Sequence, residues 1–324
     1  MAERLPTSPL RLLTKDILSL QAAMSYRLER GEPVPGEIRR IVSEEADFAI
    51  KHLTNTAVRR REEAIHEARK SIKKIRGVLR LVRSDFGRTY RDENRTLRDA
   101  GRRLSQIRDA EAVIEVFDDL VQRYRGDLQK NVWAAIRRGL ETGKREVEMA
   151  AGIDSVLRQA AAALRRIARD VKRWPLQHDG FQAIESGLAG TYKRGRKALA
   201  EAQRDPTPDN YHYFRKRVKD HWYHVRLLEN LWTEEMKARE AGLKDLQNWL
   251  GDDHNLVVLR EKLQQEPDKF GKRPEADLFC ALAGQYQAEL RDKSVSLGLR
   301  LYEQKPKRFT QSMSHLWGAW ETYR

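Results

Sequence analysis

An internal repeat restricts the fold of this chain more than any other feature of its sequence. Shifting the 324 residues by 146 positions places HEARKSIKKIRGVLRL (66–81) on HYFRKRVKDHWYHVRL (212–227), and the register then continues without a gap. A match of this length is hard to ascribe to shared helical composition. The sequence therefore predicts a duplicated multi-helix unit, with repeats over about 30–173 and 176–320, whose halves pack around a pseudo-two-fold axis.

The spacing of apolar residues predicts an all-α chain. Apolar residues recur every three or four positions, as in AVIEVFDDLVQRY (112–124), and alternating β-branched runs are absent. The proline-containing stretch KRWPLQHDG (172–180) separates the two repeats, but it is too short to suggest independently moving domains. We therefore expect a single domain over 10–324, in which equivalent basic helices can face each other across one central groove.

The charge balance indicates a polyanionic partner. Lys and Arg exceed Asp and Glu by 63 to 48, which gives a formal net charge of +15. Such an excess is typical of proteins that bind nucleic acid, an acidic membrane surface or a free phosphate polymer, although a merely soluble basic helical protein is the alternative.

Other compositional features exclude several classes of protein. The single cysteine, Cys280, rules out an internal disulfide and a thiolate metal site, and its apolar neighbours predict a buried side chain. The N-terminus lacks the apolar region of a signal peptide, and no segment approaches 18 uncharged apolar residues. We therefore expect a cytoplasmic protein without a membrane partner, a metal or a cofactor.

Cations form one strip along each copy of the repeated segment. At about 100° per residue, the side chains of the first strip fall within a sector roughly 80° wide, directly beside the apolar face. The second strip has the same layout, except that Trp222 takes the place of Arg76. We call these the first and second basic strips; their members are His66, Arg69, Lys73, Arg76 and Arg80, and His212, Arg215, Lys219 and Arg226.

The first basic strip has the properties of an anion site. Arg69 and Arg80 are separated by about 16 Å of helix, with a cation on each turn between them. Like charges at this spacing repel by roughly 0.2–0.5 kcal/mol per pair, and a ligand can offset that cost. An exposed salt-bridging helix is the alternative, but it needs acids four residues away on the strip, and none is there. Arg as a bidentate donor and Lys as a point charge together suit a chain of phosphates.

The roles of the histidines and of several neighbouring residues stay open at this point. His66 and His212 can hydrogen-bond an anion or serve only as structural residues of a first helical turn. His221 and His224 fall off the strip, and packing is favoured over metal binding for both. Asp109 and Asn255 can cap helices that start within 105–113 and 250–258, or orient nearby cations, with the structural role favoured. Four further cations could extend the groove, namely Lys51, Arg194, Arg196 and Lys197.

The pattern H-x-x-R-K-x-x-K, present at 66–73 and again at 212–219, resembles the CHAD family, the conserved histidine α-helical domain. The similarity covers nearly the whole chain. The resemblance implies two four-helix bundles about a pseudo-two-fold axis with a basic central pore. It also implies binding of inorganic polyphosphate and association with polyphosphate granules in microbial cells. The binding residues it implies are His66, Arg69, Lys70, Lys73, Arg76, Arg80, His212, Arg215, Lys216, Lys219 and Arg226.

The second copy departs from the pattern of the first. Trp222 and Asp220 stand where the first copy has Arg76 and Lys74, so its contribution to binding can be weaker or differently shaped.

Two other functions compete with non-catalytic polyphosphate binding. Sequence-tolerant binding of DNA or RNA would also use a basic surface, but no helix-turn-helix or RNA-binding signature is evident. An enzyme that transfers phosphoryl groups or cuts polyphosphate would need carboxylate-held Mg²⁺ or a phosphate-cradling glycine loop. Neither motif occurs, and the triphosphatase signature E-x-E-x-K found in some CHAD proteins is also absent, since EVEMA (146–150) ends in alanine. We therefore expect no catalytic activity.

Overall fold

All regular secondary structure in the described part of the chain is helical, which confirms the predicted all-α class. The computed structural model describes residues 26–55, 60–124, 130–150, 152–271 and 273–322. The first-repeat helices are α2 (Val34–Thr54), α3 (Arg61–Leu81), α4 (Arg83–Phe86), α5 (Thr89–Arg123), α6 (Lys130–Ala150) and α7 (Ile153–Asp170). The second-repeat helices are α8 (Gln182–Arg204), α9 (Pro208–Leu227), α10 (Thr233–Gln265), α11 (Arg273–Leu301) and α12 (Pro306–Thr322). Short 3₁₀ turns η2 (Val171–Arg173), η3 (Glu229–Leu231) and η4 (Pro267–Lys269) join some of them.

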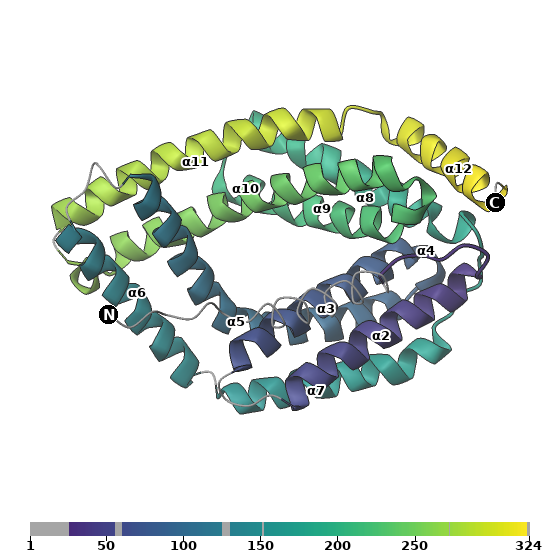
Figure 1. Cartoon of the computed structure of the whole chain (residues 1–324), viewed down its shortest axis with the longest axis horizontal. Coiled ribbons are helices and arrows are strands. Elements are labelled where there is room, and N and C mark those ends of the chain that lie inside the picture. The colour runs from purple at the N-terminus through teal and green to yellow at the C-terminus, as the bar shows by residue number, and fades with distance from the viewer. Residues whose placement is uncertain (1–25, 56–59, 125–129, 151, 272, 323–324) are drawn as a thin grey trace, which may run out of the picture.

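α3 and α9, which carry the two basic strips, end 146 residues apart. α3 ends at Leu81 and α9 at Leu227, so the 146-residue register of the sequence holds for this pair. α2 packs on α3 and α7, while α9 packs on α8 and α10 and α10 packs on α11. Figure 1 shows α2, α3 and α7 along one side of the molecule and α8 to α11 along the other, with α6 near one end and α5 running from beside α3 toward it. The pseudo-two-fold axis itself stays a prediction.

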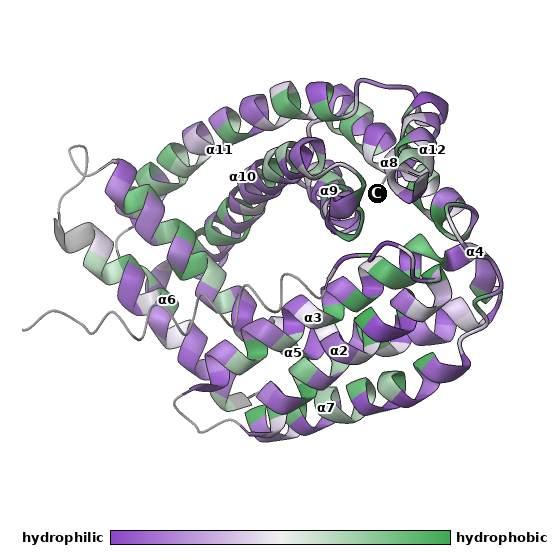
Figure 2. Cartoon of the chain, turned by 45° about the vertical axis from the view of Figure 1, so that its right-hand side comes forward, coloured by the Kyte–Doolittle hydropathy of each residue, from purple (hydrophilic) through white to green (hydrophobic). Residues whose placement is uncertain are grey.

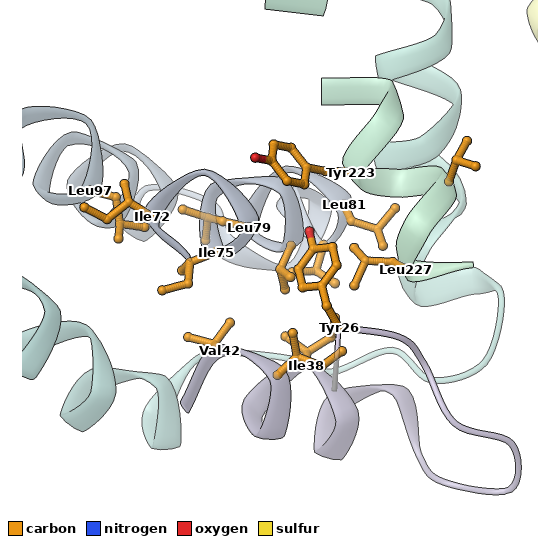
Figure 3. Close-up of a cluster of buried hydrophobic side chains, with 14 of the residues drawn as sticks. Tyr26, Ile38, Val42, Ile72, Ile75, Leu79, Leu81, Leu97, Tyr223 and Leu227 are labelled. Carbon is orange, nitrogen blue, oxygen red and sulfur yellow. The ribbon is translucent and has the colours of Figure 1, made fainter. Parts of the chain in front are cut away.

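The larger hydrophobic core contains side chains from both repeats. Hydrophobic and hydrophilic residues alternate along α2 and α7, as expected of helices with one buried face (Figure 2). Ile75 and Leu79 of α3 lie in this core together with Leu227 of α9 (Figure 3). Tyr26, with no exposed surface, sits between α2, α3 and the end of α9, and its hydroxyl donates a hydrogen bond of 3.1 Å to the Lys74 carbonyl. The core therefore ties the first repeat directly to the second.

A second, smaller core lies along the far ends of the long helices. Phe117 of α5, Ile136 of α6, Leu259 of α10 and Phe279 of α11 belong to it, and the Phe117 and Phe279 rings stack with centroids 5.1 Å apart. Cys280 is buried in the same cluster, as the sequence predicts. The middle portions of α5 and α10 run between the two cores.

The helix starts expected within 105–113 and 250–258 are wrong. Both stretches lie inside single uninterrupted helices, α5 and α10. Neither stretch contains a proline, and in the second stretch buried residues continue through the helix from Leu250 to Leu256. Asp109 consequently has no helix terminus to cap.

The segment between the repeats is held by two aspartates. Asp85 accepts hydrogen bonds from the backbone N–H groups of Gln177 and His178 at 3.0 and 3.2 Å, and its other oxygen lies 2.6 Å from His178 Nδ1. Asp179 accepts from the backbone N–H of Val34 at 2.7 Å. These contacts fix the connection against α2 and α4.

α3 and α9 approach each other closely at a glycine. The His224 ring donates through Nε2 to the Gly77 carbonyl at 3.0 Å. A Cβ atom on Gly77 would lie 2.9 Å from Tyr223 Cβ and 2.9 Å from the Tyr26 hydroxyl, so a larger residue would force the helices apart. The close contact of the two basic strips thus depends on a residue without a side chain.

Replacing Gly77 by alanine is expected to destabilise the protein by about 1–3 kcal/mol, because the added methyl meets the backbone-proximal Tyr223 Cβ. The matched control is Gly143→Ala in α6, where an added Cβ meets nothing within 4 Å. That change should stabilise the helix by up to about 1 kcal/mol. Urea unfolding at neutral pH measures both, and equal effects of the two substitutions would contradict the role given to Gly77.

Candidate anion-binding cavity

A cavity of about 910 Å³ opens between the two cores. Its walls come from the N-terminal halves of α3 and α9 and from the middle of α5 and α10. The lining contains seven cationic side chains against three carboxylates, a formal excess of four positive charges. The cations are Arg69, Lys70, Lys73, Arg108, Arg215, Lys216 and Lys219, and the acids are Asp109, Glu115 and Asp252.

The structure brings the leading parts of both basic strips together in this cavity. The predicted residues that line it are His66, Arg69, Lys70 and Lys73 from α3 and His212, Arg215, Lys216 and Lys219 from α9. The predicted residues that do not line it are Arg76, Arg80, Arg226, Lys51, Arg194, Arg196 and Lys197. The cavity therefore uses the first two turns of each strip, and its two walls are equivalent in the sequence register.

Acids from α5 neutralise part of the cavity. Arg69 Nη2 lies 3.3 Å from Asp109 Oδ1, and Arg108 Nη2 lies 2.7 Å from Glu115 Oε1. No such acid was visible on the strip itself, because Asp109 is brought to Arg69 by tertiary packing of a different helix. Within the described residues, Arg215 forms no ion pair with a carboxylate. The charge that remains uncompensated is thus concentrated on the α9 wall and the floor.

Lys73 and Lys219 meet at the floor of the cavity. Burial is the main cause that lowers the pKa of Lys73 to about 6, and repulsion from the Lys219 ammonium adds to it. Burial also lowers the pKa of Lys219 to about 8, with a further contribution from Arg215. The described part of the chain supplies no carboxylate in ion-pair contact with either ammonium group. At neutral pH the pair therefore holds less positive charge than two ordinary lysines.

Histidines lie beside these cations in their neutral form. Burial lowers the pKa of His66, and burial followed by the neighbouring His254 lowers the pKa of His212 to about 4. The His212 and His254 rings lie 4.1 Å apart, centroid to centroid, and His212 Nδ1 is buried without a hydrogen-bond partner. Both strip histidines line the cavity, where a neutral ring can donate a hydrogen bond to an oxyanion.

Sequence reasoning missed Arg108 and His254. The two residues occupy equivalent positions 146 residues apart, and both line the cavity. Extending the register comparison from α3 and α9 into α5 and α10 would have found this pair of basic residues.

The later turns of the strips have partners outside the cavity. Arg80 Nη1 lies 3.1 Å from Asp220 Oδ1, and Arg226 Nε lies 3.2 Å from Glu240 Oε1. Arg226 also stacks over the Trp222 ring at 4.9 Å. These acids come from facing helices, so the expectation that the strips lack acidic partners holds only within each helix.

The cations of α2 and α8 lie outside the cavity as well. Arg194 donates to Thr191 Oγ1 at 3.0 Å, and Arg196 donates to the Gln304 carbonyl at 2.7 Å. Lys51 and Lys197 are exposed. None of these four residues lines the cavity, so its position does not support the predicted extension of the groove.

His221 and His224 are completely buried in the core. Burial lowers the pKa of both rings well below the ordinary value, to about 4 for His224. In the described residues, no group of three or more His, Cys, Asp or Glu side chains is placed to hold a metal ion. None of the helices in that part of the chain is long and apolar enough to cross a membrane.

The fold and the cavity define an all-helical domain with a cation-lined recess between α3, α5, α9 and α10. The chain belongs to the CHAD domain family, whose model matches residues 45–264, a range that includes both basic strips. No curated protein matches the sequence.

Two solved structures share the fold at low sequence identity. The CHAD domain from the plant Ricinus communis is 18% identical with a TM-score of 0.57, and the match covers 86% of this chain and 94% of that one. PptA from Streptomyces chartreusis is 14% identical with a TM-score of 0.55, over 85% of this chain and all of that one.

Replacing Lys73 by methionine should stabilise the protein at neutral pH. Between pH 6 and about 10.5 the unfolded chain keeps the Lys73 proton while the folded chain has largely released it. The free energy of unfolding of the wild type therefore rises with pH over this range. Because the Lys73 side chain is only partly buried, solvent screening reduces the expected gain to about 1–2 kcal/mol at pH 7, and the rise of stability with pH becomes shallower.

Chemical unfolding at pH 6, 7.5 and 9 measures this effect, with Lys70→Met as the control. Lys70 is exposed and pairs with Glu67 at 3.1 Å, so its replacement should change the unfolding free energy by less than about 0.5 kcal/mol. A loss of stability in the Lys73 variant at neutral pH would contradict the interpretation.

Proposed function

We propose that this protein binds inorganic polyphosphate in the cavity without cleaving it, as a cytoplasmic protein that associates with polyphosphate granules. The observation that carries the proposal is the floor of the cavity, where Lys73, Lys219 and Arg215 gather without an ion-paired carboxylate among the described residues. Desolvated, unpaired cations are costly, and a polyanion that enters the cavity offsets that cost. Membership of the CHAD family, with polyphosphate binding implied by the sequence resemblance, supports the same ligand.

Each class of side chain has a distinct part in the proposed binding. Arg69 and Arg215 stand at equivalent positions on opposite walls, where each guanidinium can hold two oxygens of one phosphate. Lys73 and Lys219 act as point charges at the floor. His66 and His212 contribute neutral hydrogen bonds. A repeating phosphate chain satisfies all three kinds of donor along one path.

The recessed position of the cations favours a thin chain over a nucleic-acid duplex. The Arg69 side chain is only 12% exposed, and Lys73 and Lys219 are partly buried between α3 and α9. The phosphates of a duplex lie on a rigid convex surface and bind outward-facing cations. A single flexible phosphate chain can enter the recess instead.

The acids of the cavity support a binding role over catalysis. Cleavage of a phosphoanhydride generally relies on carboxylates that hold Mg²⁺ at the reacting phosphate. Asp109 and Glu115 are engaged in ion pairs with Arg69 and Arg108. Burial, followed by repulsion from Asp119, raises the pKa of the remaining acid, Asp252, to about 6.

The double variant Arg69→Gln/Arg215→Gln should weaken binding of long-chain polyphosphate by roughly 100-fold, since each charged hydrogen-bond donor contributes about 1.5–3 kcal/mol. Isothermal titration calorimetry at physiological salt measures the affinity. The control is Arg300→Gln/Arg308→Gln, which removes the same charge at two exposed positions outside the cavity.

Three results would contradict the proposal. The first is an equal loss of affinity in the control variant, and the second is ready displacement of polyphosphate by duplex DNA or single-stranded RNA. The third is release of orthophosphate from polyphosphate by the purified protein with Mg²⁺, which would overturn the non-catalytic part.

Polyphosphate binding should take up about one proton at pH 7.5. The bound anion raises the pKa values of Lys73 and Lys219 from their depressed values of about 6 and 8, so the pair becomes fully charged on binding. The affinity should accordingly fall as the pH rises above about 6. Calorimetric titrations in buffers of different ionisation enthalpy measure the uptake, and long chains keep the titration of end groups small.

The variant Lys73→Met/Lys219→Met provides the control for this linkage. It should lose the proton uptake together with most of the pH dependence. Uptake that persists in the variant would assign the titrating groups elsewhere, for example to His66 or Asp252.

A further inference from the structure

A second group of cations lies on one flank of the contact between α3 and α9. Arg80 of α3 and Arg217 of α9 contact the same carboxylate, with Nη1 of Arg80 3.1 Å from Asp220 Oδ1 and Nη2 of Arg217 3.2 Å from Oδ2. Arg76 of α3 donates from Nε to Asn94 Oδ1 at 3.1 Å. Arg194 of α8 is close enough to Arg217 for the two charges to repel. We call Arg76, Arg80, Arg194 and Arg217 the arginine cluster.

The arginine cluster carries more charge than its one carboxylate can neutralise. Burial, followed by repulsion from Arg80, lowers the pKa of Arg76 to about 10. Burial and the charge of Arg217 lower the pKa of Arg194. Among the described residues, neither Arg76 nor Arg194 forms an ion pair, and Arg217 Nε is buried without a hydrogen-bond partner. Such crowding is unfavourable in the free protein and is relieved by an anion.

The cluster lies about one turn of α3 beyond the cavity lining. Arg76 follows Lys73 by three residues on the first basic strip, which corresponds to about 4.5 Å along the helix. Arg98 of α5, an exposed residue, is near enough to depress the pKa of Arg76 further. A chain of phosphates that reaches Lys73 can therefore contact the cluster without leaving α3.

The equivalent flank of the contact lacks such a cluster. Trp222 occupies the position that Arg76 has in the other repeat, and Arg226, the counterpart of Arg80, pairs with Glu240 and stacks on Trp222. Lys74, the counterpart of Asp220, is buried against Glu45 with its ammonium 2.5 Å from the carboxylate. The cations of this flank are neutralised, and an aromatic ring covers part of it.

We infer that the arginine cluster is a second anion seat, so that a polyphosphate chain held in the cavity extends past Lys73 onto this flank alone. The inference rests on the proposed function and adds to it a direction for the bound chain and a preference for long polymers. Tripolyphosphate can occupy the cavity by itself, whereas a long chain contacts both seats. Asp220 holds Arg80 and Arg217 in place between binding events.

The test compares two ligands on two matched variants. Arg76→Gln/Arg194→Gln removes two charges of the cluster. The control Lys237→Gln/Lys244→Gln removes two exposed charges of α10 beside the Arg226–Glu240 pair of the equivalent flank. The first variant should bind long-chain polyphosphate about tenfold or more weakly, yet bind tripolyphosphate within about twofold of the wild type. For this first variant, the slope of log K against log salt concentration should also become shallower by roughly one. The second variant should match the wild type with both ligands.

The outcomes separate this inference from the proposed function. Failure of the wild type to bind either polymer would overturn the proposed function. Normal binding by the wild type, with equal long-chain affinities for the two variants, would overturn the second seat alone. Loss of tripolyphosphate binding in the cluster variant would also overturn it, because the arginines would then belong to the cavity seat or to its folding. Retained tripolyphosphate binding shows that the variant is folded.

Discussion

The close crossing of α3 and α9 at Gly77 determines the rest of this structure. It brings Lys73 and Lys219 together, where burial and mutual repulsion lower their pKa values to about 6 and 8, so part of the repulsion is relieved by loss of a proton at neutral pH. The buried side chains around the crossing provide the opposing term, since each large apolar residue contributes about 1.5–3 kcal/mol. Tyr26 and Tyr223 both lie at this point and are almost completely buried. Apolar packing therefore holds the two amine groups next to each other before any ligand arrives.

The distribution of acids decides where this repulsion is retained and where it is removed. Asp109 compensates Arg69 at the wall of the cavity, and Glu240 compensates Arg226 on one flank. The floor receives no such partner from the described residues, and Asp252, which lines the same cavity, has its pKa raised to about 6 by burial. A carboxylate that is partly protonated near neutral pH neutralises less of the surrounding charge. The cavity thus keeps a positive field on the surface that a polyanion can reach.

Local periodicity was sufficient to predict helical structure and the basic strips, because both depend on residues three and four positions apart, but it placed two helix starts inside α5 and α10. The all-α class and the burial of Cys280 follow from the same information. The partners of the strips could not be read in this way. Asp109 and Asp220 reach Arg69 and Arg80 through tertiary packing, and no helical wheel of one element contains a residue from another. The division of each strip into cavity-lining and flanking turns depends on the crossing angle of α3 and α9, which local spacing does not specify.

The differences between the two repeats have a structural meaning that neither copy shows alone. Lys74 and Asp220 are equivalent positions of opposite charge, and each is buried beside a partner of the other sign: Glu45 for Lys74, and Arg80 and Arg217 for Asp220. One flank consequently closes around a buried ion pair and Trp222. On the other flank, a single carboxylate is shared by two arginines, and Arg76 stays without an ion pair in the described structure. A duplicated fold with identical copies would present two equal flanks to a polymer that leaves the cavity. Exchange of the charge at one pair of equivalent positions, together with Arg for Trp at a second, makes the flanks unequal, while the eight residues that α3 and α9 contribute to the cavity stay identical in type.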